Sequence, residues 1–368
     1  MLNNDLRYKI GLSLIPKVGH ITAKKLVSYV GSYEGIFKES KNSLMKVPGI
    51  GEIMAKSIIS ANALHKADEE IEFIQKKNIQ VLFYLDKEYP ERLKNCEDAP
   101  ILIYALGETD LNARKVLSIV GTRKATPDGV DFCEKLVKEL KERGHNPLIV
   151  SGLAYGIDIV AHKTALDCDL QTVAVFGHGL DIVYPASHKK VAGQIINQGM
   201  LITDFPSKSI RDKNNFIKRN RIIAGMADAT IVVESGDKGG ALVTADIANS
   251  YNRDVFAVPG RINDVYSRGC NNLIKTNRAA MLTGIEDLEY ILGWENTAPK
   301  DAFQKELFVE LNDEEKNITE ILQKFGELSI DMLCVKANQP TSKVSPVLLD
   351  LEFKGMVRSL PGKVYKLI

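Results

Sequence analysis

Short apolar runs alternate with helix-length segments along the middle of this 368-residue chain, and this alternation constrains the fold more than any other feature. The apolar runs predict strands at 80–84, 116–120, 148–151, 172–176, 201–203, 230–233 and 255–258. The segments between them predict helices at 129–143, 157–166, 187–198 and 241–251. Short buried strands separated by helices are typical of a mostly parallel sheet covered on both faces. The sequence therefore predicts an α/β, doubly wound sheet that binds ligands at the carboxyl ends of its strands, near a switch in strand order.

Two similar segments precede this region. Ile15-Pro16-Lys17-Val18-Gly19 and Val47-Pro48-Gly49-Ile50-Gly51 each read apolar–Pro–x–apolar–Gly and lead into an amphipathic helix. This pattern is typical of a helix-hairpin-helix pair, whose tight turns direct backbone N–H groups at phosphate without reading base sequence. The second copy is the stronger, because Lys17 replaces the first glycine. Basic residues outnumber acidic ones over residues 1–66, which leaves two interpretations open: weak contact with duplex DNA, or helix packing alone.

The tail after Trp294 reads as a linker followed by three helices and a short hairpin around residues 360–363, an order that resembles a winged helix. Its reading helix, around residues 342–354, balances Lys343 and Lys354 against Asp350 and Glu352, which favours protein contact or packing over groove binding. The predicted domains are a helix-hairpin-helix (SAM-like) domain at 1–66, the sheet domain at 67–295, a linker at 296–312 and a winged-helix-like domain at 313–368.

Composition narrows the class of protein. The net charge of +1, with 45% hydrophobic and 26% charged residues, describes an ordinary globular chain. The five cysteines are scattered without C-x-x-C spacing, and no apolar run reaches about 18 residues, so we expect reduced thiols in a cytoplasmic protein that does not bind a membrane. The sequence has no cluster of His and Cys residues, so no metal site is predicted. The run Gly177-x-Gly179 lacks the third glycine of a dinucleotide loop and no P-loop sequence is present, so no cofactor is expected.

The stretch NNFIKRNRIIAGMADATIVVES, residues 214–235, carries most of the functional information. Its cations are predicted at the start of a helix that leads into a strand, where an α/β protein holds phosphate. Phe216 lies among them, as in proteins that bind single-stranded nucleic acid; the alternative is a solvated helix face. Gly239-Gly240 offers further backbone amides. The cationic set is Lys208, Arg211, Lys213, Lys218, Arg219 and Arg221.

Other predicted strands also end in glycine-bearing turns, at Gly121-Thr122-Arg123, Ser151-Gly152, Gly177 and Gly260. No nucleophile or acid–base pair stands beside these groups, which favours binding over catalysis. Asp158 and His162 are spaced to face one another on a helix. We interpret them as a cap that holds the helix start to its loop rather than as a catalytic pair.

Taken in order, the motifs VGTRKATPDG, IVSGLAYGIDIVAH, FGHGLDIVYP, RNRIIAG, VVES, GALVTA, VFAVPG and SRGCNNLI resemble those of the DNA-processing protein A family (DprA, also called Smf). The resemblance extends over about residues 80–282. It implies an extended Rossmann-like domain that binds single-stranded DNA without enzymatic activity and forms a homodimer. It also implies a role in natural transformation (competence), as a recombination mediator that protects incoming strands and loads the RecA recombinase onto them.

The resemblance further implies that Arg123 holds phosphate and that the RNR run lines the same groove, with the alternative that a buried arginine or Asn220 braces the loop. The predicted DNA-binding residues are Arg123, Ser151, Gly152, Gly156, Lys213, Phe216, Lys218, Arg219, Asn220, Arg221, Gly239 and Gly240. No catalytic or metal-binding residue is expected. The chain departs from the family at Ile217-Lys218, where proline usually follows the phenylalanine, and at Asp237-Lys238, where a Ser-Gly pair is common.

A rival class shares a similar sheet and an arginine-rich helix. Lysine-decarboxylase-like phosphoribohydrolases cleave nucleotides and need a Pro-Gly-Gly-x-Gly-Thr loop followed by a glutamate. This chain has Asp237-Lys238-Gly239-Gly240-Ala241-Leu242 and no glutamate in the next turn. That difference argues against nucleotide cleavage.

Overall fold

The structure is a computed structural model that describes residues 4–60, 62–294, 311–360 and 362–367. It divides into two compact units, residues 1–295 and 296–368, which are considered separately. Most of the predicted linker, residues 296–310, lies outside the described residues.

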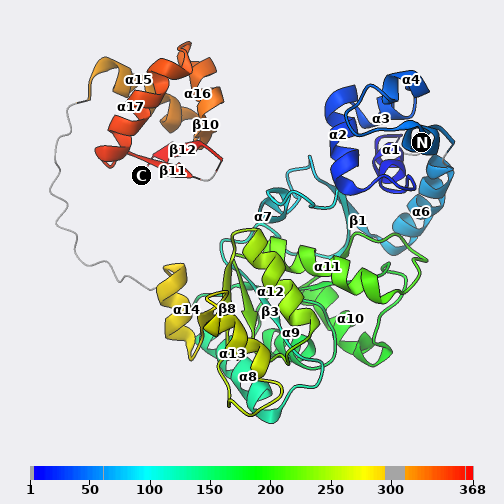
Figure 1. Cartoon of the computed structure of the whole chain (residues 1–368), viewed down its shortest axis with the longest axis vertical. Helices are drawn as coiled ribbons and strands as arrows, with labels where there is room; N and C mark the ends of the chain where they lie inside the picture. The colour runs from blue at the N-terminus through cyan, green and yellow to red at the C-terminus, as the bar shows by residue number, and fades with distance from the viewer. Residues whose placement is uncertain (1–3, 61, 295–310, 361, 368) are drawn as a thin grey trace. The chain divides into compact units, whose positions relative to one another are not determined.

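The first unit begins with helices that enclose a core of their own (Figure 1). Gly31, in the left-handed conformation, ends the second of them, and Ser32 and Ser40 cap the next two. The core is apolar and continues onto the first two strands of the sheet through Phe83 and Leu102. The last helix crosses the predicted domain boundary at residues 66/67. The helices are α1 (Asn4–Ser13), α2 (His20–Val30), α3 (Tyr33–Ile36), α4 (Lys41–Leu44), α5 (Glu52–Ser60) and α6 (Ala63–Lys77).

The centre of the unit is a nine-stranded sheet in the order β1-β2-β6-β5-β4-β3-β7-β8-β9. The pairs from β6 to β9 are all parallel, whereas β2 runs antiparallel to both β1 and β6. Strand order reverses between β3 and β7, where Val120 is paired with Val232. The strands are β1 (Gln80–Phe83), β2 (Leu102–Gly107), β3 (Val116–Val120), β4 (Leu148–Ser151), β5 (Thr172–Val175), β6 (Gly199–Thr203), β7 (Ala229–Val232), β8 (Asp254–Ala257) and β9 (Ala280–Met281).

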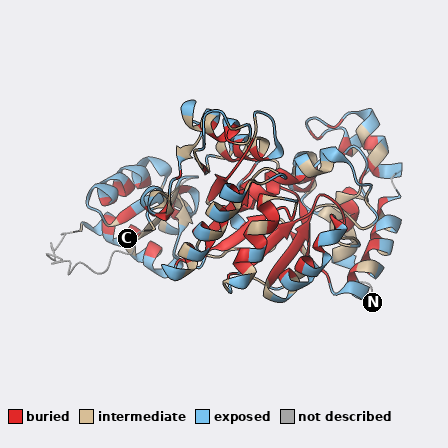
Figure 2. Cartoon of the chain, turned by 90° about the horizontal axis from the view of Figure 1, so that it is seen from below, coloured by how far each residue is buried: buried red, intermediate tan, exposed pale blue. Residues whose placement is uncertain are grey.

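Helices cover both faces of this sheet, so its central strands β3 to β7 are buried along their length (Figure 2). Alternate residues of β3 show the two faces: Val116 and Val120 pack in one core with α11 and α12, and Leu117 and Ile119 pack in another with α8 and α9. The helices are α7 (Glu91–Lys94), α8 (Pro127–Glu142), α9 (Ile157–Asp167), α10 (Lys189–Gln198), α11 (Lys213–Met226), α12 (Gly240–Ser250), α13 (Arg268–Lys275) and α14 (Ile285–Leu292), with a short 3-10 turn at Ala186–His188.

The predicted doubly wound, mostly parallel sheet is therefore confirmed, with strand ends shifted by a residue or two. The prediction missed β2 and β9. The run Leu102–Gly107 has the apolar character of a buried strand, but only the four-residue helix Glu91–Lys94 separates β1 from β2, in place of the longer helices between the parallel strands. β9 has only two residues and no pattern that distinguishes it from a loop.

The second unit has the predicted order of three helices and a hairpin, with one additional short strand. A capping box between Asn312 and Glu315 starts its first helix. Lys354 donates to Glu315 at 2.7 Å, so one of the two cations of the predicted reading helix is paired within the unit. The elements are α15 (Asp313–Phe325), β10 (Leu328–Ser329), α16 (Ile330–Ala337), α17 (Thr341–Phe353), β11 (Val357–Leu360) and β12 (Val364–Leu367), with sheet order β10-β12-β11.

All five cysteines are free thiols, and Cys96, Cys133 and Cys270 are buried. Across the ranges that the structure describes, no helix has the length and apolar character needed to cross a membrane. Within the same ranges no three His, Cys, Asp or Glu side chains cluster as metal ligands.

Candidate nucleic-acid interface

A cavity of about 630 Å³ opens at the carboxyl end of β3, beside the point where strand order reverses. Its walls come from the loop after β3, the start of α9, one face of α11, the loop after β7 and the first turn of α12. In an open α/β sheet this crevice is the place where ligands bind, because the flanking loops diverge there. The lining residues named in the sequence prediction are Arg123, Lys213, Phe216, Arg219, Asn220, Gly239 and Gly240.

The amino end of α12 forms part of this wall. Gly239 is its extended N-cap and provides no side-chain cap, so the first N–H groups of the helix have no partner within it. Asn220 of α11 donates to the carbonyl of Gly240 at 3.2 Å and fixes this helix end against α11. The arrangement presents the positive end of a helix dipole to the cavity.

Three exposed cations, Arg123, Lys213 and Lys238, stand around the opening. None of them forms an ion pair with any residue that the structure describes. Nearby carboxylates are engaged elsewhere: Asp237 pairs with Arg268 at 3.6 Å, and Asp212 caps α11 by accepting from the N–H of Asn214 at 2.7 Å. The rim therefore carries uncompensated positive charge.

Arg219, by contrast, is fully buried and serves as a brace. Its guanidinium donates to the carbonyl of Gly152 at 2.9 Å and also to the carbonyl of Val175. Burial lowers the pKa of Arg219 to about 10, against the opposing effect of Asp158. A side chain at Gly152 would lie within 2.7 Å of this guanidinium, so glycine is needed there. These contacts fit the bracing role that was the alternative to DNA contact, and contact of Arg219 with DNA stays a prediction.

Arg221 points away from the cavity. Its guanidinium donates to the carboxylate of Asp204 and to the carbonyl of Asp98, and His20 of α2 lies 3.5 Å from the same carboxylate. Burial alone would raise the pKa of Asp204, but Arg221 and His20 hold it below its ordinary value of 3.8. Arg221 therefore links α11 to the amino-terminal helices and does not line the cavity.

The prediction that Lys218, Arg219 and Arg221 lie at the start of a helix is wrong. α11 begins at Lys213, five residues before Lys218, because Asp212 provides the cap. The RNR run consequently occupies the middle of the helix. Arg219 and Arg221 are buried there, and Lys218 is exposed but does not line the cavity.

Three further predicted residues lie behind the wall and shape it. The Ser151 hydroxyl is buried and donates to the carbonyl of Ile119 at 2.6 Å. Gly156 has φ of +76°, and a Cβ there would be 2.0 Å from the carbonyl oxygen of Thr122. Together with Gly152, these residues hold the loop that presents Arg123, and their contribution to binding remains a prediction.

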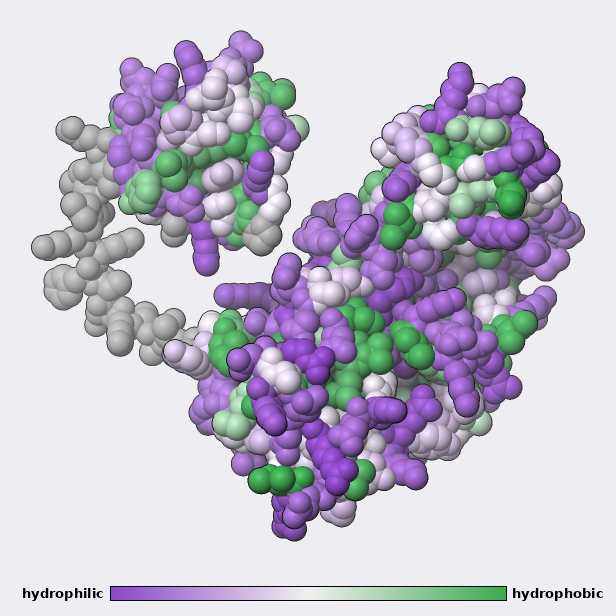
Figure 3. Space-filling view, in the orientation of Figure 1, coloured by the Kyte–Doolittle hydropathy of each residue, from purple (hydrophilic) through white to green (hydrophobic). Residues whose placement is uncertain are grey.

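Aromatic rings gather beside the cations. Phe216 lies 5.8 Å from Tyr184 and 6.3 Å from His178, centroid to centroid. The guanidinium of Arg211 sits 5.6 Å from the Tyr184 ring, and Tyr184 is 43% exposed. The prediction missed Tyr184, although it belongs to the quoted FGHGLDIVYP motif. Figure 3 shows hydrophobic atoms over α11 and α12 framed by hydrophilic ones; Ile217 and Val243 of these helices line the cavity.

Asp158 and His162 do not contact each other. Asp158 accepts from the N–H of Ala154 at 3.4 Å, whereas His162 Nδ1 is 2.7 Å from the hydroxyl of Thr172. Burial lowers the pKa of His162 to about 3, so the ring is neutral, and burial raises the pKa of Asp158 despite Arg219. Asp158 is the only carboxylate among the described residues that line the cavity. The contact with Ala154 supports the interpretation of Asp158 as a loop cap, whereas His162 is bonded to Thr172 and is not part of that cap.

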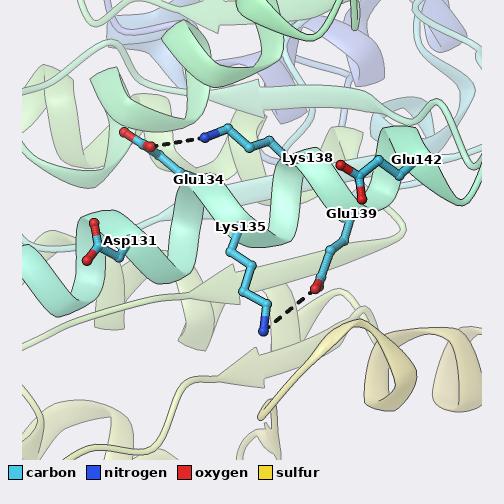
Figure 4. Close-up of a pocket in the computed structure, with 6 residues that line it drawn as sticks. All are labelled: Asp131, Glu134, Lys135, Lys138, Glu139 and Glu142. Carbon is cyan, nitrogen blue, oxygen red and sulfur yellow. Dashed lines mark hydrogen bonds and ion pairs between the residues drawn. The ribbon is translucent and has the colours of Figure 1, made fainter.

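A second charged hollow follows the outer face of α8 (Figure 4). Its charges neutralise one another along the helix: Lys138 contacts Glu134 at 3.3 Å and Lys135 contacts Glu139 at 3.7 Å. Asp131 and Glu142 also line it, which leaves an acidic excess. We assign no ligand to this hollow.

The fold and the cavity define an α/β protein with a cationic ligand site at the switch point of its sheet. Comparison with known families is more specific. The model described as DNA recombination-mediator protein A matches residues 80–292, the SAM-like helix-hairpin-helix tandem matches 10–61, and the DprA winged helix domain matches 307–363. The chain belongs to the DNA recombination-mediator protein A (DprA/Smf) family, with a helix-hairpin-helix domain before the Rossmann-like domain and a winged-helix domain after it.

Individual relatives agree. The chain is 35% identical to protein Smf of Synechocystis over 77% of its own length and 72% of that protein. It is 38% identical to DNA processing protein DprA of Streptococcus pneumoniae, over 54% of this chain and 70% of that one.

Two solved structures are similar. The X-ray structure of DNA processing protein A from S. pneumoniae superposes with a TM-score of 0.67 at 30% identity, covering 77% of this chain and 97% of that one. The second is DNA processing protein A from Helicobacter pylori, a protein described as having a single-stranded DNA binding mode. Its structure superposes with a TM-score of 0.53 at 28% identity and covers 59% of this chain and 96% of that one.

Proposed function

We propose that this protein is a non-enzymatic single-stranded DNA-binding protein that acts in the cytoplasm as a recombination mediator. The observation that carries the proposal is the cavity at the switch point. Its rim has three cations without an ion-pair partner among the described residues, its wall contains a helix amino end, and Phe216 lies beside the cations. Cations that contact phosphates and a ring that contacts a base are the elements of single-strand binding. Membership of the family supports it, as does the binding described for the H. pylori relative.

The finer part of the proposal is that the protein forms a homodimer, protects incoming strands during natural transformation and loads the RecA recombinase onto them. Membership of the DprA/Smf family is the support for these three properties. A pull-down of purified RecA on the DNA-bound protein tests the partnership, and absence of any RecA-dependent signal would contradict it. Sedimentation of the protein alone tests the dimer.

The decisive test of strand binding uses a double variant of the rim, Arg123→Ala with Lys213→Ala. Both side chains are exposed, so the fold should survive. We expect fluorescence anisotropy with labelled oligo-dT to show an affinity about 10- to 100-fold weaker, since charged hydrogen bonds to phosphate are lost. The slope of log K against log salt should also become less negative by about 1.4, or about 0.7 for each phosphate contact removed.

The matched control removes two exposed lysines from the α8 face, Lys135→Ala with Lys138→Ala, and so changes the net charge equally. Its affinity should stay within about twofold of the wild type, because charges farther away than about 8 Å are screened at physiological salt. If the rim variant binds oligo-dT as tightly as this control, the cavity is not the binding site.

Nucleotide cleavage remains the rival function. The cavity offers one carboxylate, Asp158, which is buried and contacts the backbone of its own loop, so it is poorly placed as an acid or base. Incubation with nucleoside monophosphates should therefore release no base detectable by chromatography. Sustained turnover that disappears in Asp158→Asn would overturn the non-enzymatic proposal.

A second binding function, weak contact with duplex DNA, is favoured by the amino-terminal hairpins. Gly49 has φ of +88°, and Lys17, at the matching position, adopts +67°, so both turns have the same backbone form. No atom lies within 4 Å of a Cβ built at Gly19, Gly49 or Gly51, so the turn tips are open. Lys17→Ala with Lys46→Ala should weaken duplex binding without altering oligo-dT binding; identical duplex isotherms would show that the hairpins only pack.

A further inference from the structure

The loop between β8 and α13, residues 258–267, exposes two large aliphatic side chains. Ile262 is 87% exposed and Val265 is 56% exposed. Single exposed aliphatic residues are ordinary on protein surfaces. Two exposed aliphatic residues three positions apart on one short loop are less common. The polar contacts that hold this loop in shape leave both side chains exposed.

The loop has a fixed internal structure. The carboxylate of Asp264 accepts from the N–H of Tyr266 at 3.0 Å and from the hydroxyl of Ser267 at 3.3 Å. The side chain of Asn271 both donates to and accepts from the backbone of Gly260, at 3.0 and 3.1 Å. None of these contacts depends on Ile262 or Val265. The loop is therefore shaped by polar contacts that leave both aliphatic groups in solvent.

The same loop adjoins the wall of the cavity. The N–H of Ser235 donates to the carbonyl of Tyr266 at 2.8 Å, and the N–H of Gly269 donates to the carbonyl of Ser235 at 2.9 Å. Ser235 and Gly236 line the cavity, and a Cβ built at Gly236 would be 3.4 Å from the carbonyl of Val265. A strand that leaves the cavity past Gly236 consequently meets this loop.

Charge at the loop suits a polyanion. Asp264 is engaged within the loop, and Asp237 beside it pairs with Arg268. Arg261 is exposed and forms no ion pair with any residue in the described ranges. Arg261 precedes Ile262, so a free cation stands next to an exposed aliphatic group. In proteins that bend duplex DNA, apolar side chains such as Ile enter between neighbouring bases, and a single strand exposes the same base faces. Arginine contacts the phosphate.

We propose that the loop Gly260–Ser267 is a second subsite for single-stranded DNA, in which Ile262 and Val265 contact bases beyond the cavity and Arg261 contacts a phosphate. This inference rests on the proposed function, because the strand is the one held by the cavity. With this subsite, the DNA interface is no longer limited to the cavity and its rim cations. It continues past the end of β7 to the loop that follows β8.

The test compares strand lengths. The affinity of the double variant Ile262→Ala with Val265→Ala is measured by anisotropy with two lengths of oligo-dT. A strand of roughly 6 nucleotides occupies the cavity alone, and one of roughly 20 nucleotides also reaches the loop. We expect unchanged affinity for the short strand and about fivefold weaker affinity for the long one. Arg261→Ala should flatten the salt slope by about 0.7 on the long strand only.

The matched control is Leu85→Ala, a 55% exposed aliphatic residue just after β1, at the opposite end of the sheet. It should bind both strands as the wild type does. Equal affinity of the loop variant and the wild type for the long strand would overturn the subsite, and so would an equal loss on both strands. If the wild type binds neither strand, the proposed function itself fails, and this outcome is distinct from failure of the subsite.

Discussion

The cavity at the carboxyl ends of the strands and the hollow along α8 are both lined by charge, but they differ in how that charge is compensated. On α8 the lysines contact glutamates one turn away and an acidic excess remains. At the cavity, Arg123, Lys213 and Lys238 have no carboxylate partner in the described residues, and the buried Asp158 faces Arg219. A polyanion is repelled by the first surface and attracted by the second. The number of charges on a surface therefore matters less than whether they are paired.

A second contrast lies within the cationic run of α11. Arg219 and Arg221 are buried and donate to carbonyl groups and a carboxylate, whereas Lys213 is exposed on the rim. Buried cations shape the wall, and exposed ones remain available to a ligand.

The largest effect is expected from Arg219→Ala. It removes donors from the carbonyls of Gly152 and Val175 and the positive charge that favours the buried carboxylate of Asp158, so stability to urea should fall by about 3 to 5 kcal/mol. Its neighbour Lys218, which is exposed, is the control, and Lys218→Ala should change stability by less than about 0.5 kcal/mol. Full stability of Arg219→Ala combined with lost DNA binding would make Arg219 a contact residue instead of a brace.

The next effect concerns Phe216, which stands beside Tyr184 in the cavity. If the ring stacks on a base, Phe216→Leu should weaken oligo-dT binding by about 1 to 3 kcal/mol while keeping apolar bulk. Phe216→Tyr retains a ring and should bind nearly normally. Equal affinities of the leucine and tyrosine variants would show that the ring is only packing.

A prediction of the pH dependence of stability follows from the Arg221–Asp204 contact. Because the pKa of Asp204 lies below 3.8 in the folded protein, the carboxylate stabilises the fold above that pH and the contribution is lost as pH falls through the folded pKa. Asp204→Asn should therefore be less stable than the wild type at pH 7, and the difference should shrink toward pH 3. Urea titrations across this range measure it; a constant difference would show that charge pairing with Arg221 contributes little.

How far the sequence predicted this molecule depends on the range of each interaction. Seven of the nine strands, and the position of Arg123 at the end of β3, follow from local patterns. β2, β9 and the place where strand order reverses do not. The roles of Arg219 and Arg221 do not follow from local patterns. Their partners, Gly152, Val175 and Asp98, lie 67, 44 and 123 residues away in sequence, so nothing in the RNR run distinguishes a brace from a rim cation. The start of α11 at Lys213 was not predicted, because the N-cap Asp212 lies among the cations and the charge pattern does not mark it as a helix cap.

The smallest effect is expected on α8. Lys135→Ala with Lys138→Ala breaks two ion pairs between exposed lysines and half-buried glutamates one turn away, each worth about 0.3 to 0.5 kcal/mol, so stability should fall by less than about 1 kcal/mol. Moderate salt should abolish even this difference, because the pairs are screened. A larger, salt-resistant loss would mean that charge on this face contributes to the fold as the buried cations of α11 do, and the contrast between paired and unpaired surfaces would no longer identify the binding site.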